Sequence, residues 1–335
     1  MKQDRVAMTS AEDPETRRQT RFACLAIQLD MNEETQQQNR FTPPPYEVRT
    51  PHITLADNVI LAADTQRMFE EAIGALRHHK TIYSDWGFGA VDPAGRNMIL
   101  NLYGPPGTGK TLAAEALAGT LKRPYIHIGI AEIESKYVGD TAKNISAAFA
   151  CAAAEGAVLF FDEADTLLGA RLSSVTQGID NEINAMRSTL LIELERFEGI
   201  VVFATNFAKN YDSAFVSRIR YHIEFKLPDL ACRQRLWERM LVPGVPLAEE
   251  RDLLIARCAE ASDGLSGREI RTVLRTAFPR AIVDAPDAPR VHWKHLDTAI
   301  ADIRAAHRNV GKARREVASN DGGAEAGRRL LGLAE

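Results

Sequence analysis

The sequence predicts an α/β protein: a large domain with a parallel sheet flanked by helices, then a small domain made only of helices. Three observations support this prediction. From about residue 97 to residue 227, apolar strand-like runs alternate with amphipathic helix-like runs, which is typical of a parallel sheet covered on both faces. The glycine-rich run "GPPGTGKT" directly follows one strand-like run and opens a helix-like one. After residue 228 the chain shows only helical periodicity.

The composition is that of an ordinary globular protein. Of the 335 residues, 45% are hydrophobic and 26% are charged, and the formal net charge is −4. This mildly acidic balance disfavours nucleic acid as a partner, because nucleic-acid-binding domains are normally basic. No apolar run approaches the ~18 residues of a membrane span, and the four cysteines (Cys24, Cys151, Cys232 and Cys258) lack metal-ligand spacing. We therefore expect a cytoplasmic protein with reduced thiols and no membrane contact.

These patterns divide the chain into four segments. Residues 1–50 are polar and end in a proline-rich stretch, which predicts a flexible arm and linker. Residues 51–227 are expected to form the α/β domain and residues 228–312 the helical domain, with Pro228 at the junction. Residues 313–335 are expected to be a disordered tail.

Each element has a local signal. The run "ADTQRMFEEAIGALRHH" has helical spacing after Asp64, a candidate N-cap. Continuous apolar runs predict buried strands at "NMILNLYG", "YIHIGI", "AVLFFD" and "IVVFATN". The helical runs between them are "TLAAEALAGTL", "TAKNISAAFACAAAE" and "NAMRSTLLIELERF". In the last domain, helices are predicted at "LACRQRLWERMLV", "RDLLIARCAEAS", "SGREIRTVLRTAF" and "HLDTAIADIRAAHRNV".

The glycine-rich run is a P-loop, and its place between a strand and a helix supports that assignment. Its glycines allow backbone N–H groups to turn toward phosphate oxygens where a Cβ would clash. Lys110 can reach the β- and γ-phosphates, and the Thr111 hydroxyl can ligate Mg²⁺. We therefore expect ATP and Mg²⁺ as ligands of a site made by Gly104, Pro105, Pro106, Gly107, Thr108, Gly109, Lys110, Thr111 and Leu112.

Polar residues at two further strand ends complete the predicted phosphate site. Asp162 and Glu163 follow the strand "AVLFF", where Asp162 would hold Mg²⁺ and Glu163 would act as general base toward the attacking water. Asn206 ends the strand "IVVFAT" and can orient that water beside the γ-phosphate. An acidic pair that only stabilises a helix N-terminus is the plain structural alternative for the two carboxylates.

The motifs "GPPGTGKT", "LFFDEADTLLGAR", "FATN" and "GLSGREI" resemble, in this order and spacing, those of the AAA+ ATPases, specifically their protein-remodelling branch. The resemblance covers about residues 57–310. It implies that Asn206 is the first sensor of the nucleotide. It also implies that Arg268, in the helical lid domain, is the second sensor, the alternative being a solvated charge on a helix.

The same resemblance implies contacts with the nucleotide base. Gly267 belongs to the second-sensor motif. Relatives usually carry a glycine pair that contacts adenine in the region where this chain has Val59 and Ile60. The family thus places the base contacts at Val59 and Ile60, and we expect Gly267 to belong to the nucleotide-binding residues.

The segment "YDSAFVSRIRYHIEF" resembles the family's arginine-finger segment, which reaches the nucleotide of the next subunit. Counted from Asp212, the second family arginine falls on Arg220, whereas the first position is Ser217 with Arg218 beside it. Both arginines stay candidates. A finger acting in trans implies a self-assembled oligomer, and the family implies a homo-hexamer.

The stretch "SKYVGD" is similar to the pore loop of spastin- and katanin-type relatives. In such a loop Lys136, Tyr137 and Val138 would contact a protein substrate, the aromatic ring gripping an extended chain through buried area. The alternative is that Tyr137 packs locally under the next helix.

The motifs "DSAFVSR" and "GLSGRE" resemble the pachytene-checkpoint-type remodellers, which act on HORMA-domain proteins and have bacterial relatives in anti-phage cyclase systems. Three alternatives stay open. One is another single-ring chaperone or unfoldase, for enzyme reactivation or as a protease partner. The others are a nucleic-acid motor or loader, and a nucleotide-gated scaffold without turnover.

Overall fold

The computed structural model describes residues 46–92, 95, 97–129, 140–169, 178–206 and 211–319. The expected arm up to residue 45, the expected pore loop at residues 136–138 and the last residues of the expected tail lie outside the described part of the chain. No helix within the described ranges is long and apolar enough to cross a membrane.

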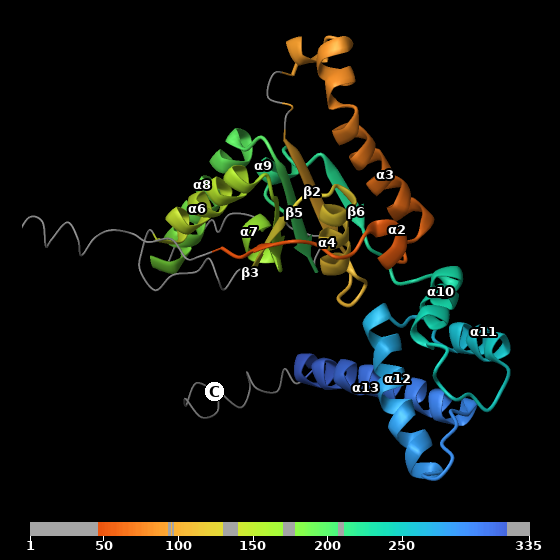
Figure 1. Cartoon of the computed structure of the whole chain (residues 1–335). Coiled ribbons are helices and arrows are strands. Elements are labelled where there is room, and N and C mark those ends of the chain that lie inside the picture. Colours follow the sequence, from red (N-terminus) through yellow and green to blue (C-terminus); the bar gives the residue numbers. More distant parts are fainter. Residues whose placement is uncertain are drawn as a thin grey trace, which may run out of the picture. The chain divides into compact units, whose positions relative to one another are not determined.

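A six-stranded sheet with the order β1-β3-β4-β5-β2-β6 organises the first domain (Figure 1). The four strands predicted from apolar runs are present, and β6 continues the parallel set, whereas β1 pairs antiparallel with β3. The strands are β1 (Val48–Arg49), β2 (Met98–Tyr103), β3 (Tyr125–Gly129), β4 (Val158–Asp162), β5 (Ile200–Thr205) and β6 (Tyr221–Glu224). The prediction of a parallel sheet is confirmed, and the short antiparallel edge strand was missed.

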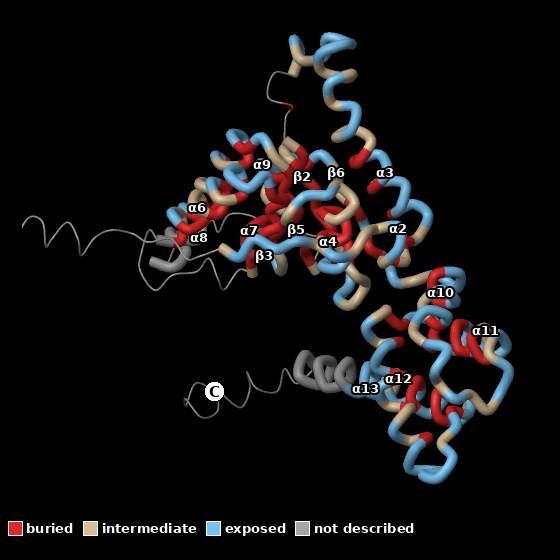
Figure 2. The backbone as a smooth tube through the Cα atoms, viewed as in Figure 1, coloured by how far each residue is buried: buried red, intermediate tan, exposed pale blue. Residues whose placement is uncertain are grey.

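Helices cover both faces of this sheet, as its uninterrupted apolar strands require. One core cluster joins the sheet to α6 (Asp140–Glu155), α7 (Asp165–Leu168), α8 (Gly178–Arg196) and α9 (Ser213–Val216). The other joins it to α2 (Leu55–Asn58), α3 (Ala63–Arg77) and α4 (Lys110–Thr120). Figure 2 shows the buried residues gathered along the strands and on the helix faces that meet them.

Aromatic packing fixes the middle of the sheet. Phe161 on β4 and Phe203 on β5 are paired in register and fully buried, and their rings stack at 5.3 Å and 15°. Phe149 of α6 tilts onto Phe161 and meets Phe197 edge-on at 5.2 Å. The carboxyl ends of β4 and β5 are therefore held side by side, which matters because the predicted site residues follow both strands.

Two local details differ from expectation. Asp64 is not the N-cap of α3: Ala62 occupies that position, and Asp64 lies in the first turn, where its charge still faces the positive end of the helix dipole. The last helix, α13 (Trp293–Ser319), continues past residue 312, where the tail was expected to begin.

The helical domain contains the predicted helices α10 (Leu230–Met240), α11 (Arg251–Ala261), α12 (Gly267–Asp284) and α13 around one core cluster. Trp237 is fully buried there, and its indole N–H donates to Ser262 Oγ at 2.9 Å. The guanidinium of Arg233 is also buried, and it donates to Ala259 O (2.7 Å) and Pro228 O (2.9 Å) and pairs with Asp263. Arg233 thus ties the end of α11 to the chain just before α10.

Replacing this arginine by an apolar side chain of similar length tests its structural role. We expect Arg233→Met to lower the free energy of unfolding by about 2–4 kcal/mol, because Ala259 O and Pro228 O each lose a charged donor and Asp263 loses its ion-pair partner. Urea titration followed by circular dichroism measures the change. Arg271→Met is the matched control, since Arg271 is exposed on α12. If Arg233→Met and Arg271→Met had the same urea midpoint, the structural role assigned to Arg233 would be wrong.

The two cysteines of the helical core are expected to be unreactive. Burial raises the pKa of Cys232 to about 11 and that of Cys258 to about 12. At pH 8 the thiolate, the reactive form, is then roughly one part in a thousand or less for these residues. Iodoacetamide labelling followed by peptide mass spectrometry should modify both only in denaturant; rapid labelling of Cys258 in the folded protein would contradict its burial.

Candidate nucleotide-binding site

The backbone of the P-loop has the shape that its glycines permit. Gly104, Gly107 and Gly109 have φ values of 140°, 80° and 102°, which disfavour side chains with a Cβ. A Cβ at Gly104 would also lie 2.1 Å from Phe225 O. Gly109 is the N-cap of α4, so the loop leads directly into a helix N-terminus, where free N–H groups and the helix dipole favour an anion.

Lys110 lies buried at the centre of this loop. Its ammonium donates to Gly104 O (2.7 Å), Pro105 O (2.9 Å) and Asn206 Oδ1 (3.0 Å). Burial lowers the pKa of Lys110, and the nearby carboxylates of Asp162 and Asp165 oppose that effect. The site therefore brings the P-loop cation and the first-sensor asparagine into direct contact, although they are 96 residues apart in sequence.

Asp162 and Thr111 form the predicted metal-binding pair. Thr111 Oγ1 donates to Asp162 Oδ2 at 2.9 Å, and the Glu163 N–H donates to Asp162 Oδ1 at 2.9 Å. Burial raises the pKa of Asp162, but hydrogen bonds from His127, Thr111 and the Glu163 amide together hold it below its ordinary value. Asp162 is therefore a carboxylate over the whole neutral range, as a cation ligand must be.

The general-base candidate Glu163 follows in an unusual backbone conformation. Its φ is 54°, in the left-handed region that few residues other than glycine adopt. The residue is exposed, whereas Ala164 next to it is buried and its N–H donates to Ala204 O of the neighbouring strand. The turn thus directs the Glu163 carboxylate outward while anchoring the chain on either side.

Asp165 contributes to the site and was not assigned from the sequence. Both of its carboxylate oxygens accept from the Asn206 backbone N–H, at 3.1 and 3.3 Å. It lies in the first turn of α7, three residues after Asp162, and holds the start of the segment that carries the sensor. The run of acidic residues after β4 was the signal available in the sequence. That Asp165 contacts Asn206, directly after β5, could be found only from the order of the strands in the sheet.

His127 is a second neighbour that the sequence did not reveal. It lies on β3 opposite Phe160 of β4, and the two rings stack at 4.9 Å and 22°. Its Nε2 is 3.4 Å from Asp162 Oδ2, a long contact but one that favours the ionised carboxylate. The metal-ligand candidate therefore has polar neighbours from three elements.

The lid residues Gly267 and Arg268 start α12, directly after the N-cap Ser266. The Arg268 N–H donates to Gly107 O at 3.1 Å, so the start of α12 lies against the P-loop backbone. The positive charge of Arg268 is close enough to contribute to the lowered pKa of Lys110. Both expected lid residues thus lie beside the phosphate-binding loop.

The two expected adenine contacts differ in position. Val59 is buried at the C-cap of α2 and lines a cavity of about 490 Å³ between α2, α3 and the end of α4. Ile60 is only partly buried and does not line that cavity, and neither do the P-loop residues. The cavity therefore gives no support for a role of Ile60 at the base.

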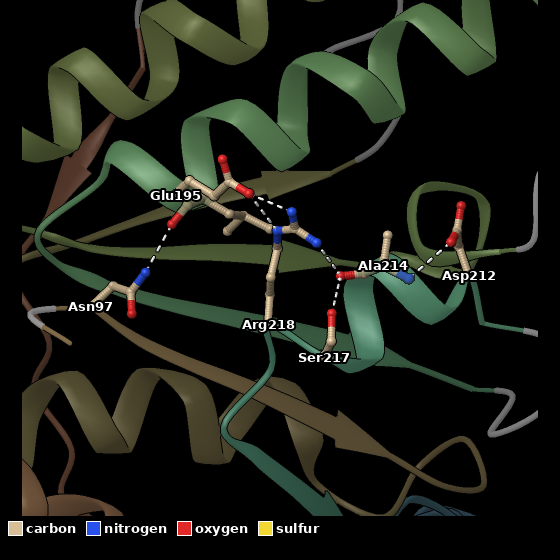
Figure 3. A network of polar contacts seen from close by, with 7 residues as sticks. Asn97, Glu195, Asp212, Ala214, Ser217 and Arg218 are labelled. Atoms are coloured by element: carbon tan, nitrogen blue, oxygen red, sulfur yellow. Dashed lines mark hydrogen bonds and ion pairs between the residues drawn. The ribbon is translucent and has the colours of Figure 1, made fainter. Parts of the chain in front are cut away.

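Arg218 belongs to a polar network at the opposite end of the sheet (Figure 3). Its Nε donates to Glu195 Oε1 at 3.0 Å, its Nη2 pairs with the same oxygen, and its Nη1 donates to Ala214 O at 2.8 Å. Close by, Asn97 Nδ2 donates to Leu194 O at 2.9 Å, just before β2 begins. The guanidinium is thus bound to a carboxylate of its own chain.

Arg220 lies at the same end of the sheet, with different partners. Its backbone N–H donates to Ile99 O at the beginning of β2. Its Nη2 donates to Tyr83 Oη at 2.9 Å and lies 3.9 Å from Asp92 Oδ2. Neither candidate finger is near the P-loop of its own chain, which follows the other end of β2.

The residues at the carboxyl end of the sheet fit a nucleotide and a divalent cation. The three P-loop glycines have positive φ values, with which backbone N–H groups can turn toward an anion, and the buried ammonium of Lys110 has only neutral oxygen partners, which phosphate oxygens can replace. The hydroxyl of Thr111 and the carboxylate of Asp162 are hard oxygen donors of the kind that Mg²⁺ prefers.

Comparison with known proteins agrees with this geometry. The family described as "ATPase family associated with various cellular activities (AAA)" matches residues 100–227. In solved structures, the fold is similar to the FIGL-1 AAA domain, with a TM-score of 0.61 and 24% identity over 76% of this chain and 86% of that one.

Curated relatives share the same region. A putative 26S proteasome regulatory subunit homologue of Methanothermobacter marburgensis is 32% identical over 65% of this chain and 58% of its own length. Spastin of Drosophila mojavensis is 33% identical over 53% of this chain and 24% of its own length. The 26S proteasome regulatory subunit 7 of Caenorhabditis elegans is 36% identical over 54% of this chain and 42% of its own length. The chain thus spans well under two thirds of the length of these relatives. Residues 100–227, which contain the P-loop and the strands up to β6, are thus similar to the ATPase domain of that family.

Proposed function

We propose that this protein is an ATP-hydrolysing, ring-forming remodeller that threads or partly unfolds a protein substrate through a central pore. The ring is a homo-hexamer, each nucleotide lies between two subunits, and Tyr137 with its neighbours Lys136 and Val138 grips the substrate. We further propose that the substrate is a HORMA-domain protein, on the resemblance carried by "DSAFVSR" and "GLSGRE".

One observation carries the oligomeric part of the proposal: the phosphate site and the finger arginines lie at opposite ends of the same strand. The backbone N–H of Arg220 donates to Ile99 O at the start of β2, and the P-loop begins at Gly104, directly after the end of β2. At about 3.3 Å per residue, those five steps separate the two backbones by roughly 16 Å, more than an arginine side chain spans. Arg220 is therefore too far from the P-loop of its own chain, and we assign it to the nucleotide of a neighbouring subunit.

The described residues divide the chemistry among them. The P-loop amides and Lys110 bind the β- and γ-phosphates, and Lys110 exchanges its loop carbonyls for phosphate oxygens. Glu163 accepts a proton from water as the water oxygen attacks the γ-phosphorus and the bond to the bridging oxygen of ADP breaks. Asn206, held by Asp165, orients that water, and the neighbour's arginine stabilises the charge on the γ-phosphoryl group.

A magnesium ion bound by Thr111 and Asp162 would neutralise charge on the β- and γ-phosphate oxygens. The contact between Thr111 and Asp162 keeps these two ligands 2.9 Å apart. His127 and the Glu163 amide hold the same carboxylate in its ionised form.

The remodelling part of the proposal is supported by the relatives and by the loop sequence. Two of the relatives are named as proteasome regulatory subunits, and a third is spastin. The stretch "SKYVGD" comes after β3 in the sequence and has the aromatic–aliphatic–glycine order of a substrate-gripping loop. Another single-ring unfoldase is the second candidate, because the same relatives favour it equally.

Mixing subunits tests whether an arginine acts in trans. We expect the double variant Arg218→Ala/Arg220→Ala, and separately Lys110→Ala, to lose ATPase activity by about 10³-fold or more. Mixed together before assembly, they should recover up to about a quarter of the wild-type rate, because some interfaces then join an intact P-loop to an intact finger. A coupled ADP-release assay measures both.

The control is a mixture of Lys110→Ala with Lys110→Ala/Arg220→Ala, in which no interface contains an intact P-loop. ATPase activity recovered in this control mixture would contradict the interpretation. So would the absence of recovered activity in the mixture of Arg218→Ala/Arg220→Ala with Lys110→Ala.

A substrate trap tests the remodelling function. Glu163→Gln should bind ATP but hydrolyse it at least about 100-fold more slowly, which prolongs the substrate-bound state. Affinity capture in the presence of ATP, followed by mass spectrometry, should recover a HORMA-domain protein. Glu163→Gln/Lys110→Ala, which cannot use ATP, gives the matched background.

Other recoveries would change the proposal in different ways. If a different protein is captured and its capture depends on Tyr137, the proposed substrate class is wrong but the proposed remodelling function stands. Equal capture by Glu163→Gln and Glu163→Gln/Tyr137→Ala would contradict the grip, and captured nucleic acid would contradict protein remodelling itself.

A further inference from the structure

We infer that Tyr83 and Asp92 are positioning residues for hydrolysis, which act by orienting Arg220 as the finger toward the neighbouring subunit. The inference rests on the proposed trans arrangement and extends it, because it names which arginine acts and what holds it. Its basis is a compact cluster between α3 and β2, made by His79, Tyr83, Phe88, Asp92, Gly95 and Arg220.

The hydroxyl of Tyr83 links the cation to a carboxylate. It accepts from Arg220 Nη2 at 2.9 Å and donates to Asp92 Oδ2 at 3.0 Å. Asp92 itself is 3.9 Å from the same guanidinium nitrogen. A phenol placed between an arginine and a carboxylate fixes the direction of the guanidinium without cancelling its charge by close contact.

The ring of Tyr83 is held from two sides. His79 stacks on it with the ring centroids 4.3 Å apart and an angle of 8°, and Phe88 meets it edge-on at 5.5 Å and 68°. His79 Nε2 also lies 3.3 Å from Gly95 O, which ties the end of α3 to the segment before β2. The tyrosine therefore has little freedom to move, and neither has the group that it orients.

Gly95 shows how closely the cluster is packed. A Cβ at this position would lie 2.2 Å from Tyr83 Oη and 2.4 Å from Asp92 Oδ2. Real Cβ atoms do not approach side-chain atoms this closely, so any larger residue must displace the tyrosine hydroxyl or the carboxylate. The backbone thus sets the position of both groups that contact Arg220.

Arg218 offers a contrast on the same edge of the sheet. Its side chain makes three hydrogen bonds, to Glu195 and to Ala214, so much of its donor capacity and its charge are already used within the chain. Arg220 makes one hydrogen bond and one longer ion pair to the described residues. A finger must offer N–H donors to phosphate oxygens, and Arg220 retains more of them.

The surface beside the cluster also suits contact with a second copy of this chain. Trp86 and Val91 have 75% and 77% of their surface exposed, and Phe88, which touches Tyr83, has 44% exposed. Large apolar side chains that are neighbours in space typically mark a contact surface. An interface formed there would bring the neighbour next to Arg220.

Removing one hydroxyl tests the inference. Tyr83→Phe should lower the kcat of ATP hydrolysis by about 10–100-fold, because a misdirected catalytic group costs that much, and should leave KM for ATP within about twofold. The effect should be absent when Arg220 is already alanine, so the double variant Tyr83→Phe/Arg220→Ala should equal Arg220→Ala. Gly95→Ala should resemble Tyr83→Phe.

The subunit-mixing assay locates the effect. Tyr83→Phe should reduce recovery only when placed on the Lys110→Ala subunit, which supplies the finger, and not on the subunit that supplies the P-loop. Tyr221→Phe is the matched control: the Tyr221 hydroxyl makes no hydrogen bond within the part of the chain that the structure describes, and we expect an unchanged rate. Urea midpoints of all variants report on folding.

Two results would overturn the inference and are distinguishable. In the first, Arg220→Ala abolishes hydrolysis, but Tyr83→Phe either has no effect or has the same effect in the wild type and in Arg220→Ala. The positioning role is then wrong, and the trans arrangement stands. If Arg220→Ala is as active as wild type while Arg218→Ala is inactive, the finger is Arg218 and this cluster has no catalytic role.

Discussion

The direction of the parallel strands is the constraint on which the rest of this structure depends. Because β2, β4 and β5 run the same way, everything that follows a strand is gathered at one edge of the sheet: the P-loop, Asp162 and Asn206. Everything that precedes a strand is gathered at the other edge, including Arg220 and the end of α8. The phosphate site and the candidate fingers are therefore separated by the length of a strand, which is why we propose that a complete hydrolytic site combines two chains.

Within the phosphate site, the charges are balanced without a ligand. The buried ammonium of Lys110 is satisfied by two loop carbonyls and Asn206, and the carboxylate of Asp162 by Thr111 and the Glu163 amide. A buried charge without such partners would destabilise the fold. The same contacts are exchangeable for phosphate oxygens and a cation, so one arrangement serves both stability and binding. The side chain of Glu163, unlike its amide, takes no part in this balance; the residue has a left-handed φ and is exposed to solvent.

The sequence predicted the residues that are defined by their own segment. The P-loop, Asp162, Glu163 and the strands that precede them carry local signals, and the structure brings Lys110, Asp162 and Asn206 together as expected. Residues that act through a partner far along the chain were missed. Asp165 acts on Asn206 across two strands, His127 meets Asp162 only because of the β3–β4 register, and Tyr83 meets Arg220 over 137 residues. Such pairs depend on strand order and register, which a single sequence does not encode locally.

The division of the two arginines follows from the same geometry. A cation that stabilises a transition state is most effective when its side chain already points toward the developing charge. No free energy is then needed to reorient the side chain during the reaction. A close carboxylate fixes direction but also attracts the cation away from the phosphate, as Glu195 does for Arg218. A neutral hydroxyl fixes direction with less competing attraction, and Tyr83 provides one for Arg220, with the charge of Asp92 placed behind it. If Arg220 is the finger, as we propose, the segment between α3 and β2 connects assembly to hydrolysis, because it contacts this side chain and carries the exposed apolar side chains beside it.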